Sequence, residues 1–359
     1  MWEYADLREC VRVDEKRVAQ TMTGDRMTNS FGLDRRQFLT AMSATAALAA
    51  IPHFAQAASA AKRLAGVFPI AFTPINARND VDYDALAAQV TFCRRGGVHG
   101  LAWPQIASGW TELSKEERRV GAEAIITAAK GGSTAIVIGV QSNTADLNET
   151  AFYAQQAERL GADAIICIPP PGVSDPAALL SYYEQVGRIT ALPLFVQAVG
   201  DFSVDLLVDM YNKIPTLRYV KDETGEPLER VTEIRRRTNN QLKSFSGRGV
   251  ATMITEMERG FSGHCPFVSI ADLYAKTYDS FHAGKAREAF DQFGKIQAAS
   301  SMIVQSDVNV LIARGVFPAG TRTRTAPPVP GAAPPHRVPP SVEETKRVLD
   351  TYLKADLRA

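Results

Sequence analysis

The sequence contains little of what marks a nucleic-acid-binding, disulfide-stabilised or metal-binding protein. Its 359 residues carry 40 Lys and Arg against 39 Asp and Glu, so no excess of positive charge indicates nucleic acid as a partner. The four cysteines, Cys10, Cys93, Cys167 and Cys265, are widely spaced and form no CxxC pair. This spacing argues against a disulfide framework and a zinc site, and nothing else in the sequence predicts a metal or another cofactor.

Long apolar segments and a dinucleotide-binding motif are also missing. Beyond the N-terminal region, no run of about 18 apolar residues predicts a membrane span in the mature protein. No G-x-G-x-x-G follows the first expected strand, which argues against a Rossmann-type site. The whole chain of 359 residues is 45% hydrophobic, which is enough for a substantial core in one large domain or two ordinary ones.

The N-terminal region has the pattern of an export signal. In "DRRQFLT" (34–40), a paired arginine precedes an Ala-rich, modestly apolar run that offers A-x-A cleavage at 55–57 and 58–60. The alternative is a buried N-terminal helix that carries two arginines. We expect residues 1–60 to be an N-terminal extension with a twin-arginine signal peptide that is removed. The twin-arginine translocase would then be a partner during export, and the mature protein would be periplasmic.

From Gly66 onward, short apolar runs alternate with longer amphipathic stretches. This alternation is typical of βα units built around a parallel sheet. Eight repeats fit a (β/α)8 TIM barrel better than an open doubly wound sheet, which normally needs fewer strands. The eight expected strands cover residues 66–73, 98–105, 134–141, 162–169, 192–199, 217–223, 242–247 and 261–267.

The domain organisation follows from the same pattern. We expect the TIM barrel to occupy residues 61–285 and additional C-terminal helices to form an extension at 286–359. A Pro-rich stretch at 325–340 interrupts this extension and is interpreted as a linker, since proline cannot continue a helix or a central strand. Ser114 with Glu117, and Ser341 with Glu344, predict capping boxes at two helix starts.

The segment "LRYVKDETGE" (217–226) carries the main functional question. Active sites of TIM barrels lie at the C-terminal ends of the strands, and Lys221 is the only lysine expected at such an end. A lysine there can attack a carbonyl and form a Schiff base as the free amine, which apolar surroundings favour. The alternative is a structural lysine paired with Asp222 or Glu223, and the chemistry alone leaves both open.

Motifs spread over all eight units point to one family. They include "GVFPIAFTP" at the first strand, "TELSKEER" after the second, "YVKDETG" around Lys221, and "FSGRG" and "MERGFSG" in the last two units. Over roughly residues 66–300 the chain resembles the dihydrodipicolinate synthase / N-acetylneuraminate lyase family of class I, Schiff-base aldolases. The resemblance implies that Lys221 forms an imine with a 2-oxo acid, usually pyruvate. It also suggests a homodimer or homotetramer.

Several positions depart from the family pattern. The tyrosine that relays protons in the family falls on Pro171, which has no proton to give, and the fifth-strand tyrosine falls on Gln197. The paired threonines that bind the pyruvate carboxylate correspond to Ile106 and Ala107, and the stretch at 172–174 lacks the family's arginine. These departures, together with export, indicate that the protein is not a genuine dihydrodipicolinate synthase.

Other polar groups near the strand ends are candidates for the missing functions. Because side chains alternate along a strand, only some of these groups can point into the barrel, and a packed or rim histidine is the alternative for His264. The candidates for substrate binding are Ser108, Thr111, Gln197, Gly247 and Cys265, and the candidates for proton transfer are His264 and Glu223.

The sequence therefore predicts an exported lyase or aldolase. It would form a Schiff base between Lys221 and a pyruvate-like 2-oxo acid or a sugar acid, and it would make or break a C–C or C–O bond. One alternative is a non-catalytic protein that binds a 2-oxo acid or sugar acid and has lost the proton relay. Another is a structural or assembly protein whose Pro-rich tail docks a partner.

Overall fold

The computed structural model describes residues 62–247, 250–303, 305–325 and 338–359. The predicted signal peptide and most of the predicted Pro-rich linker lie outside the described residues. No helix of the described part is both long and apolar enough to cross a membrane. In the same part, no group of three or more His, Cys, Asp or Glu side chains is placed to hold a metal ion.

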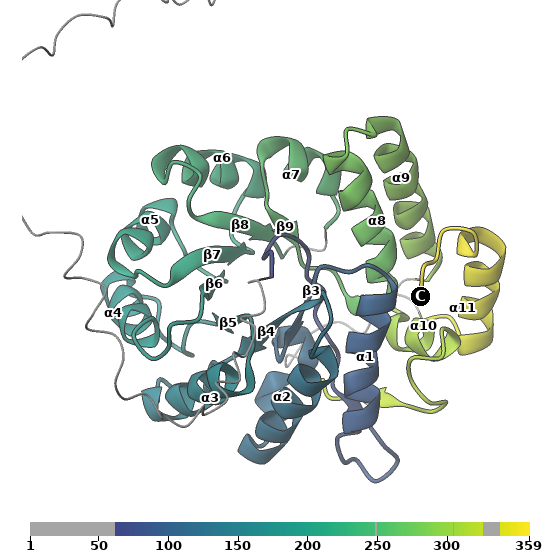
Figure 1. The fold of residues 1–359 in the computed structure, drawn as a ribbon, viewed down its shortest axis with the longest axis horizontal. Coiled ribbons are helices and arrows are strands. Elements are labelled where there is room, and N and C mark those ends of the chain that lie inside the picture. The colour runs from purple at the N-terminus through teal and green to yellow at the C-terminus, as the bar shows by residue number, and fades with distance from the viewer. Residues whose placement is uncertain (1–61, 248–249, 304, 326–337) are drawn as a thin grey trace, which may run out of the picture. The chain divides into compact units, whose positions relative to one another are not determined.

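Eight parallel strands form the central sheet, which nearly closes into a barrel (Figure 1). Their spatial order is β1-β9-β8-β7-β6-β5-β4-β3. Ile70 bridges the two edges, because it pairs with Ala102 on one side and with Phe267 on the other. The predicted TIM barrel is confirmed. The strands are β1 (Gly66–Val67), β3 (Gly100–Trp103), β4 (Ala135–Gly139), β5 (Ala164–Cys167), β6 (Leu194–Ala198), β7 (Leu217–Asp222), β8 (Lys243–Ser246) and β9 (Gly263–His264).

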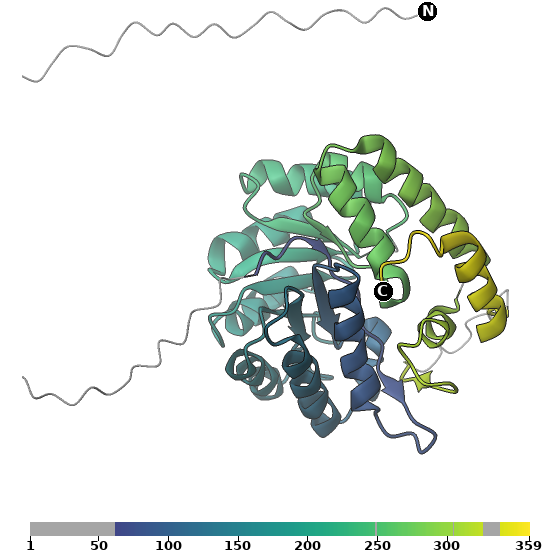
Figure 2. The same cartoon turned by 45° about the vertical axis from the view of Figure 1, so that its right-hand side comes forward.

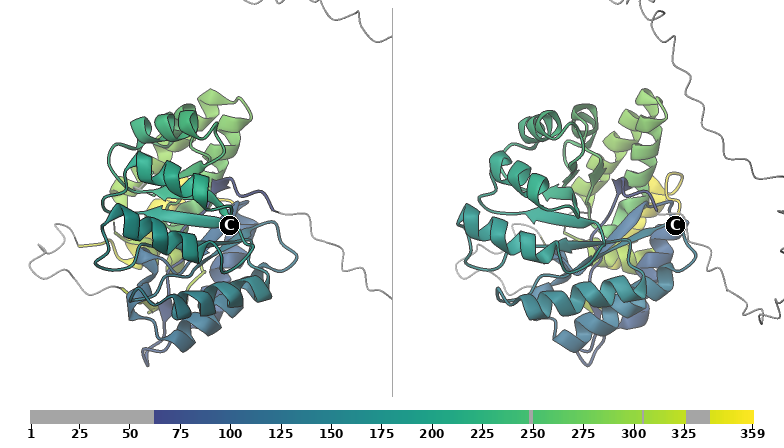
Figure 3. Two further views of the ribbon diagram at one scale, coloured as in Figure 1. Left: turned by 90° about the vertical axis from the view of Figure 1, so that its left-hand side faces the viewer. Right: turned by 60° about the vertical axis from the view of Figure 1, so that its left-hand side comes forward.

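Helices connect the strands and cover the outer face of the sheet (Figures 1 and 3). The predicted capping box at the start of α2 is present, since the Glu117 N–H donates to Ser114 Oγ and the Ser114 N–H donates to Glu117. The helices are α1 (Tyr83–Arg95), α2 (Lys115–Ala129), α3 (Leu147–Leu160), α4 (Pro176–Val186), α5 (Val204–Lys213), α6 (Pro227–Arg237), α7 (Met253–Arg259) and α8 (Ala271–His282), with 3-10 turns η1 (Ile106–Ser108), η2 (Trp110–Glu112) and η3 (Val268–Ile270).

Apolar side chains are buried on both faces of the strands. One cluster fills the barrel, and its aromatic part includes Phe195, Tyr219 and Phe245. The Phe195 and Tyr219 rings stack with centroids 4.3 Å apart, and the Phe245 ring lies edge-on to Phe195 at 5.1 Å. A second cluster lies between strands and helices and includes Val220. Because Tyr219 faces inward and Val220 outward, the alternation along β7 turns Lys221 inward again.

A C-terminal extension lies beside α8 and α1, outside the barrel (Figure 2). Its elements pack on α8 and η3, and Arg314 forms a buried ion pair with Asp272 of α8 at 2.7 Å. The predicted capping box of Ser341 and Glu344 is present at its last α-helix. The extension contains α9 (Ala286–Met302), α10 (Asp307–Ala313), α11 (Val342–Val348) and the π-helical turn η4 (Leu349–Leu353).

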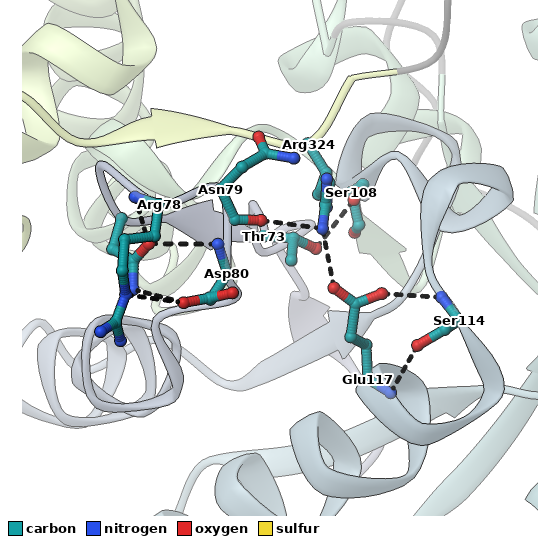
Figure 4. A network of polar contacts seen from close by, with 9 residues as sticks. Thr73, Arg78, Asn79, Asp80, Ser108, Ser114, Glu117 and Arg324 are labelled. Carbon is teal, nitrogen blue, oxygen red and sulfur yellow. Dashed lines mark hydrogen bonds and ion pairs between the residues drawn. The ribbon is translucent and has the colours of Figure 1, made fainter.

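A small two-stranded sheet ties the extension to the barrel. Strand β10 (Arg322–Thr323) pairs antiparallel with β2 (Pro74–Ile75), which the sequence did not predict. Next to β10, Arg324 donates to Glu117 Oε1 at 2.7 Å and to the Asn79 carbonyl at 3.0 Å (Figure 4). A Cβ atom on Gly109 would lie 2.7 Å from the Arg324 carbonyl oxygen, so only glycine lets the two backbones approach this closely. This contact holds the loop that contains η1 and η2.

Candidate functional site

A cavity of about 610 Å³ lies at the C-terminal ends of the barrel strands. Ile106 and Ala107 of η1 contribute apolar parts of its wall. Further along the chain, Ile270 and Ile303 add more apolar surface. Five of the residues singled out from the sequence also lie on this wall. They are Gln197, Lys221, Glu223, Gly247 and Cys265.

Lys221 is held near the end of β7 by the register of the sheet. It lies opposite Gln197 of β6 and Phe245 of β8. Its side chain is 6% exposed, and Nζ forms an ion pair with Glu223 Oε1 at 2.8 Å. One pleat below, Tyr219 belongs to the aromatic cluster of the barrel interior. The lysine therefore has an apolar base and presents its amine beside a carboxylate on the cavity wall.

Glu223 is fixed by two neighbours and by a glycine. Its Oε1 atom accepts a hydrogen bond from Gln197 Nε2 at 3.1 Å in addition to the contact with Lys221. A Cβ atom on Gly247 would lie 2.4 Å from the same oxygen, so a side chain there would displace the carboxylate. The buried Oε1 atom of Gln197 has no hydrogen-bond partner among the described residues.

Cys265 also faces the barrel interior, where it packs against the apolar cluster. Burial raises the pKa of its thiol to about 12; the charge of Lys221 opposes this rise and that of Glu223 adds to it. The thiol therefore stays protonated at neutral pH. Because the thiolate is the nucleophilic form, Cys265 contributes a small apolar surface to the cavity rather than a reactive group.

We expect Cys265 to be alkylated slowly in the folded protein. A rise of the pKa from 9.0 to about 12 lowers the thiolate fraction at pH 8 about 1,000-fold. Timed reaction with iodoacetamide, followed by peptide mass spectrometry, measures this rate for the Cys265 peptide alone. The same protein unfolded in urea is the control, and equal alkylation rates in the two states would contradict the expectation.

His264 points away from the cavity. Its ring is fully buried, and Nδ1 lies 3.0 Å from Glu256 Oε2 on α7. Glu256 also accepts hydrogen bonds from Ser246 Oγ at 3.0 Å and Thr252 Oγ1 at 2.9 Å. Burial alone would raise the pKa of Glu256, but the hydrogen bonds, that of His264 foremost, outweigh it and lower this pKa. The alternation that turns Cys265 inward turns His264 outward, so it is not placed for proton transfer at Lys221.

Ser108 and Thr111 also lie off the cavity wall. The Ser108 hydroxyl donates to the Ala71 carbonyl at 2.6 Å, and the Ser108 carbonyl accepts from Thr73 Oγ1 at 2.8 Å, close to Arg324 in Figure 4. The Thr111 hydroxyl donates to Glu112 on the surface. Neither hydroxyl is placed to bind a substrate carboxylate in this cavity, and both serve the loop that carries η1 and η2.

Five polar residues on the cavity wall were missed from the sequence, and one of them, Gln305, lies between α9 and α10. Ser269, Tyr274, Ser300 and Asp307 belong to η3, α8, α9 and α10, which all follow the last strand. A search confined to strand ends does not reach them. The sequence gives only a weak signal for these residues, because acidic and hydroxyl side chains in helical segments usually face solvent. Pro171, at the position of the family tyrosine, is exposed and is not on the described cavity wall.

Comparisons with known proteins agree with this fold. The profile of the dihydrodipicolinate synthetase family matches residues 63–329. The 4-hydroxy-tetrahydrodipicolinate synthase of Rhizobium meliloti (strain 1021) is 28% identical over 205 residues, which cover 55% of this chain and 66% of that protein, just under two thirds of its length.

Two solved structures illustrate the likeness of the fold. Dihydrodipicolinate synthase from Rhodopseudomonas palustris aligns with a TM-score of 0.67 and 21% identity, over 80% of this chain and 97% of that one. The sialic acid aldolase of Ruminococcus gnavus aligns with a TM-score of 0.68 and 17% identity, over 82% of this chain and 99% of that one. At these identities the likeness concerns the fold.

Proposed function

Because the chain belongs to the dihydrodipicolinate synthetase family, we propose that it is a lyase or aldolase that forms a Schiff base between Lys221 and a 2-oxo acid. The observation that carries this proposal is the placement of the amine. Lys221 Nζ lies on the wall of the strand-end cavity, 2.8 Å from the Glu223 carboxylate. The ion pair with Glu223 also fits the structural alternative for Lys221, but its position on the cavity wall lets the free amine attack a carbonyl carbon.

The chemistry follows from these two groups. Lys221 Nζ, as the free amine, adds to the C2 carbonyl of a pyruvate-like acid, and loss of one water molecule gives the imine. Glu223 then removes a proton from C3 and leaves an enamine, whose C3 forms a bond to an aldehyde carbon. The aldehyde oxygen takes up a proton, and addition of water to the imine releases the product and the free lysine. Cleavage is the same sequence in reverse.

Glu223 takes the place of the absent tyrosine in this proposal. No hydroxyl is available at Pro171, whereas the Glu223 carboxylate already contacts the reacting nitrogen. Its hydrogen bond from Gln197 and its close packing on Gly247 fix its orientation. Pre-positioned acid–base groups contribute about 10²–10⁴-fold to proton-transfer steps in enzymes. His264 has no part in this mechanism.

The contacts of the substrate carboxylate differ from the family pattern. Ile106 and Ala107 line the cavity where the family has hydroxyl groups, and among the described lining residues Lys221 is the only lysine or arginine. For this reason, and because of the missing tyrosine, we propose that the protein is not a genuine dihydrodipicolinate synthase. The substrate remains a 2-oxo acid or a sugar-derived acid in this proposal, bound in part through backbone groups.

Borohydride trapping tests the proposed function. The protein is incubated with pyruvate, and separately with acetone as a neutral ketone, and is then reduced and analysed by mass spectrometry. We expect one reduced pyruvate adduct on Lys221 and weaker labelling by acetone. Lys243→Met is a matched control, since Lys243 lies at the opposite end of the neighbouring strand β8, and this variant is expected to keep the adduct. Absence of an adduct with any 2-oxo acid would refute the proposal.

A second candidate function is supported by the exposed Pro171. A protein that has lost the family tyrosine and does not use Glu223 in its place would bind a 2-oxo acid as an imine without turning it over. Trapping on Lys221 with no catalysis of proton exchange would identify such a binding protein. The experiment that separates the two functions is given in the Discussion.

We also propose that the mature protein is exported to the periplasm by the twin-arginine route and assembles as a homodimer or homotetramer. The export proposal rests on the arginine pair at 35–36 and the small residues up to Ala60. N-terminal sequencing of the periplasmic protein is expected to give a start after Ala57 or Ala60. Light scattering of the purified protein gives its oligomeric state.

A further inference from the structure

The Lys221 cavity has a polar part that the proposed chemistry does not use. Ser269, Tyr274, Ser300 and Asp307 all lie on its wall and come from elements that follow the last barrel strand. We call this group the C-terminal polar wall. The cavity of about 610 Å³ is larger than a pyruvate imine requires, because pockets of about 300–1,000 Å³ hold drug-sized ligands. The polar wall therefore faces space that a second part of the substrate can occupy.

Asp307 is the charged member of this wall and is half-buried at the start of α10. It accepts a hydrogen bond from Ser269 Oγ, and no lysine or arginine pairs with it among the described residues. Burial raises the pKa of the Asp307 carboxyl, which the contact with Ser269 only partly offsets. Its place in the first turn of α10 favours an acid there, and its position on the cavity wall lets this acid without a cation partner meet a ligand.

Tyr274 and Ser300 supply hydroxyl groups next to this acid. Tyr274 is 6% exposed, and burial raises the pKa of its phenol to about 12, with a hydrogen bond from Ser300 opposing the rise and the charge of Asp307 adding to it. The phenol therefore stays a hydrogen-bond donor at neutral pH. The wall combines a carboxyl acceptor with three hydroxyls that both donate and accept, and this combination is suited to groups that do the same.

We propose that Asp307 is a specificity-determining residue, which accepts a hydrogen bond from a hydroxyl group on the substrate part remote from the imine. Ser269 orients the Asp307 carboxyl, and Tyr274 with Ser300 extends the same polar surface. The preferred aldehyde partner of the 2-oxo acid is then a hydroxylated one. This inference rests on the proposed function, because it assigns a role to the wall of the same cavity.

The test compares two aldehydes with the same three-carbon skeleton. Condensation with pyruvate is followed for D-glyceraldehyde, which carries hydroxyl groups, and for propionaldehyde, which carries none. We expect the wild-type protein to have the higher kcat/KM with glyceraldehyde. Asp307→Asn is expected to lower kcat/KM for glyceraldehyde about 5- to 10-fold, because the hydroxyl then donates to a neutral amide oxygen instead of a carboxylate, and to leave propionaldehyde unchanged.

Controls separate this role from folding and from the imine chemistry. Asp291→Asn makes the same change on the exposed face of α9, where Asp291 pairs with Arg287, and is expected to behave as wild type. The folded state raises the pKa of Asp307, so the ionised carboxylate present at neutral pH makes the folded protein less stable. Replacing this carboxylate in Asp307→Asn should therefore not lower the melting temperature. Trapping of pyruvate on Lys221 should also be unchanged in this variant.

The outcomes distinguish the inference from the function on which it rests. A wild-type protein that traps pyruvate but does not prefer glyceraldehyde overturns the role of Asp307. Equal losses with both aldehydes in Asp307→Asn, or no loss with either, also overturn it. Absence of the pyruvate adduct in the wild-type protein instead refutes the proposed function itself.

Discussion

In D2O, the protein is expected to exchange the methyl protons of pyruvate for deuterium, and Lys221→Met is expected to lose this activity. Exchange requires the imine, because only the imine makes the C3 protons acidic enough to be removed at neutral pH. Removing the covalent nucleophile of an enzyme costs on the order of 10⁴- to 10⁶-fold in rate. Proton NMR of the methyl signal measures the exchange without knowledge of the second substrate.

Glu223→Gln gives this experiment its sharpest comparison. The amide can still accept the hydrogen bond from Gln197, but it cannot take up the C3 proton. We expect this variant to keep the borohydride-trapped adduct on Lys221 and to exchange about 10²- to 10⁴-fold more slowly, which is the usual contribution of a general base. Exchange at the wild-type rate in Glu223→Gln would exclude Glu223 as the base. A wild-type protein that forms the adduct without exchange would be a binding protein.

Glu256→Ala is expected to cause the largest loss of stability. Glu256 is 1% exposed, and its two oxygens accept hydrogen bonds from Ser246, Thr252 and His264, so it joins β8, α7 and β9. Its removal leaves two buried polar groups, Ser246 and His264, without this partner. We expect the free energy of unfolding to fall by about 3–5 kcal/mol, the range for breaking a buried pair. Urea denaturation followed by circular dichroism measures the change.

The pH dependence of this effect follows from the direction of the pKa shift. The folded state lowers the pKa of Glu256, so the stability that its ionised form contributes is present above its ordinary pKa of about 4.5 and is lost as the pH falls through the lowered value. We expect the difference between wild type and Glu256→Ala to shrink between about pH 5 and pH 3. A difference that grows on acidification would contradict this assignment.

Glu256→Gln is the matched control for the stability experiment. Its oxygen can accept from Ser246 and Thr252, and its amide can donate to His264 if the ring changes tautomer. We expect it to recover most of the stability lost in Glu256→Ala. Because the amide does not titrate, the variant should lack the contribution of Glu256 to acid unfolding.

The sequence by itself determined the barrel and the position of Lys221. Apolar runs buried on both faces, with amphipathic helices between them, leave few arrangements other than parallel βα units. Capping residues such as Ser114 and Glu117 act within a single turn, so they are visible in the sequence and appear in the structure. Lys221 follows from the same local pattern, because a charge that ends an apolar strand marks the end where barrel sites lie.

Only the tertiary structure decided which neighbours of Lys221 share its cavity. Two adjacent candidates, His264 and Cys265, face opposite sides of the sheet, and a difference of one residue in register would exchange them. Long-range contacts also determine which residues form the rest of the cavity wall. Asp307 reaches the cavity because the C-terminal extension packs on α8 and η3, and β10 pairs with β2 across more than 240 positions of sequence. Local patterns carry no signal for such contacts, because the free energy that stabilises them comes from surfaces far apart in the chain.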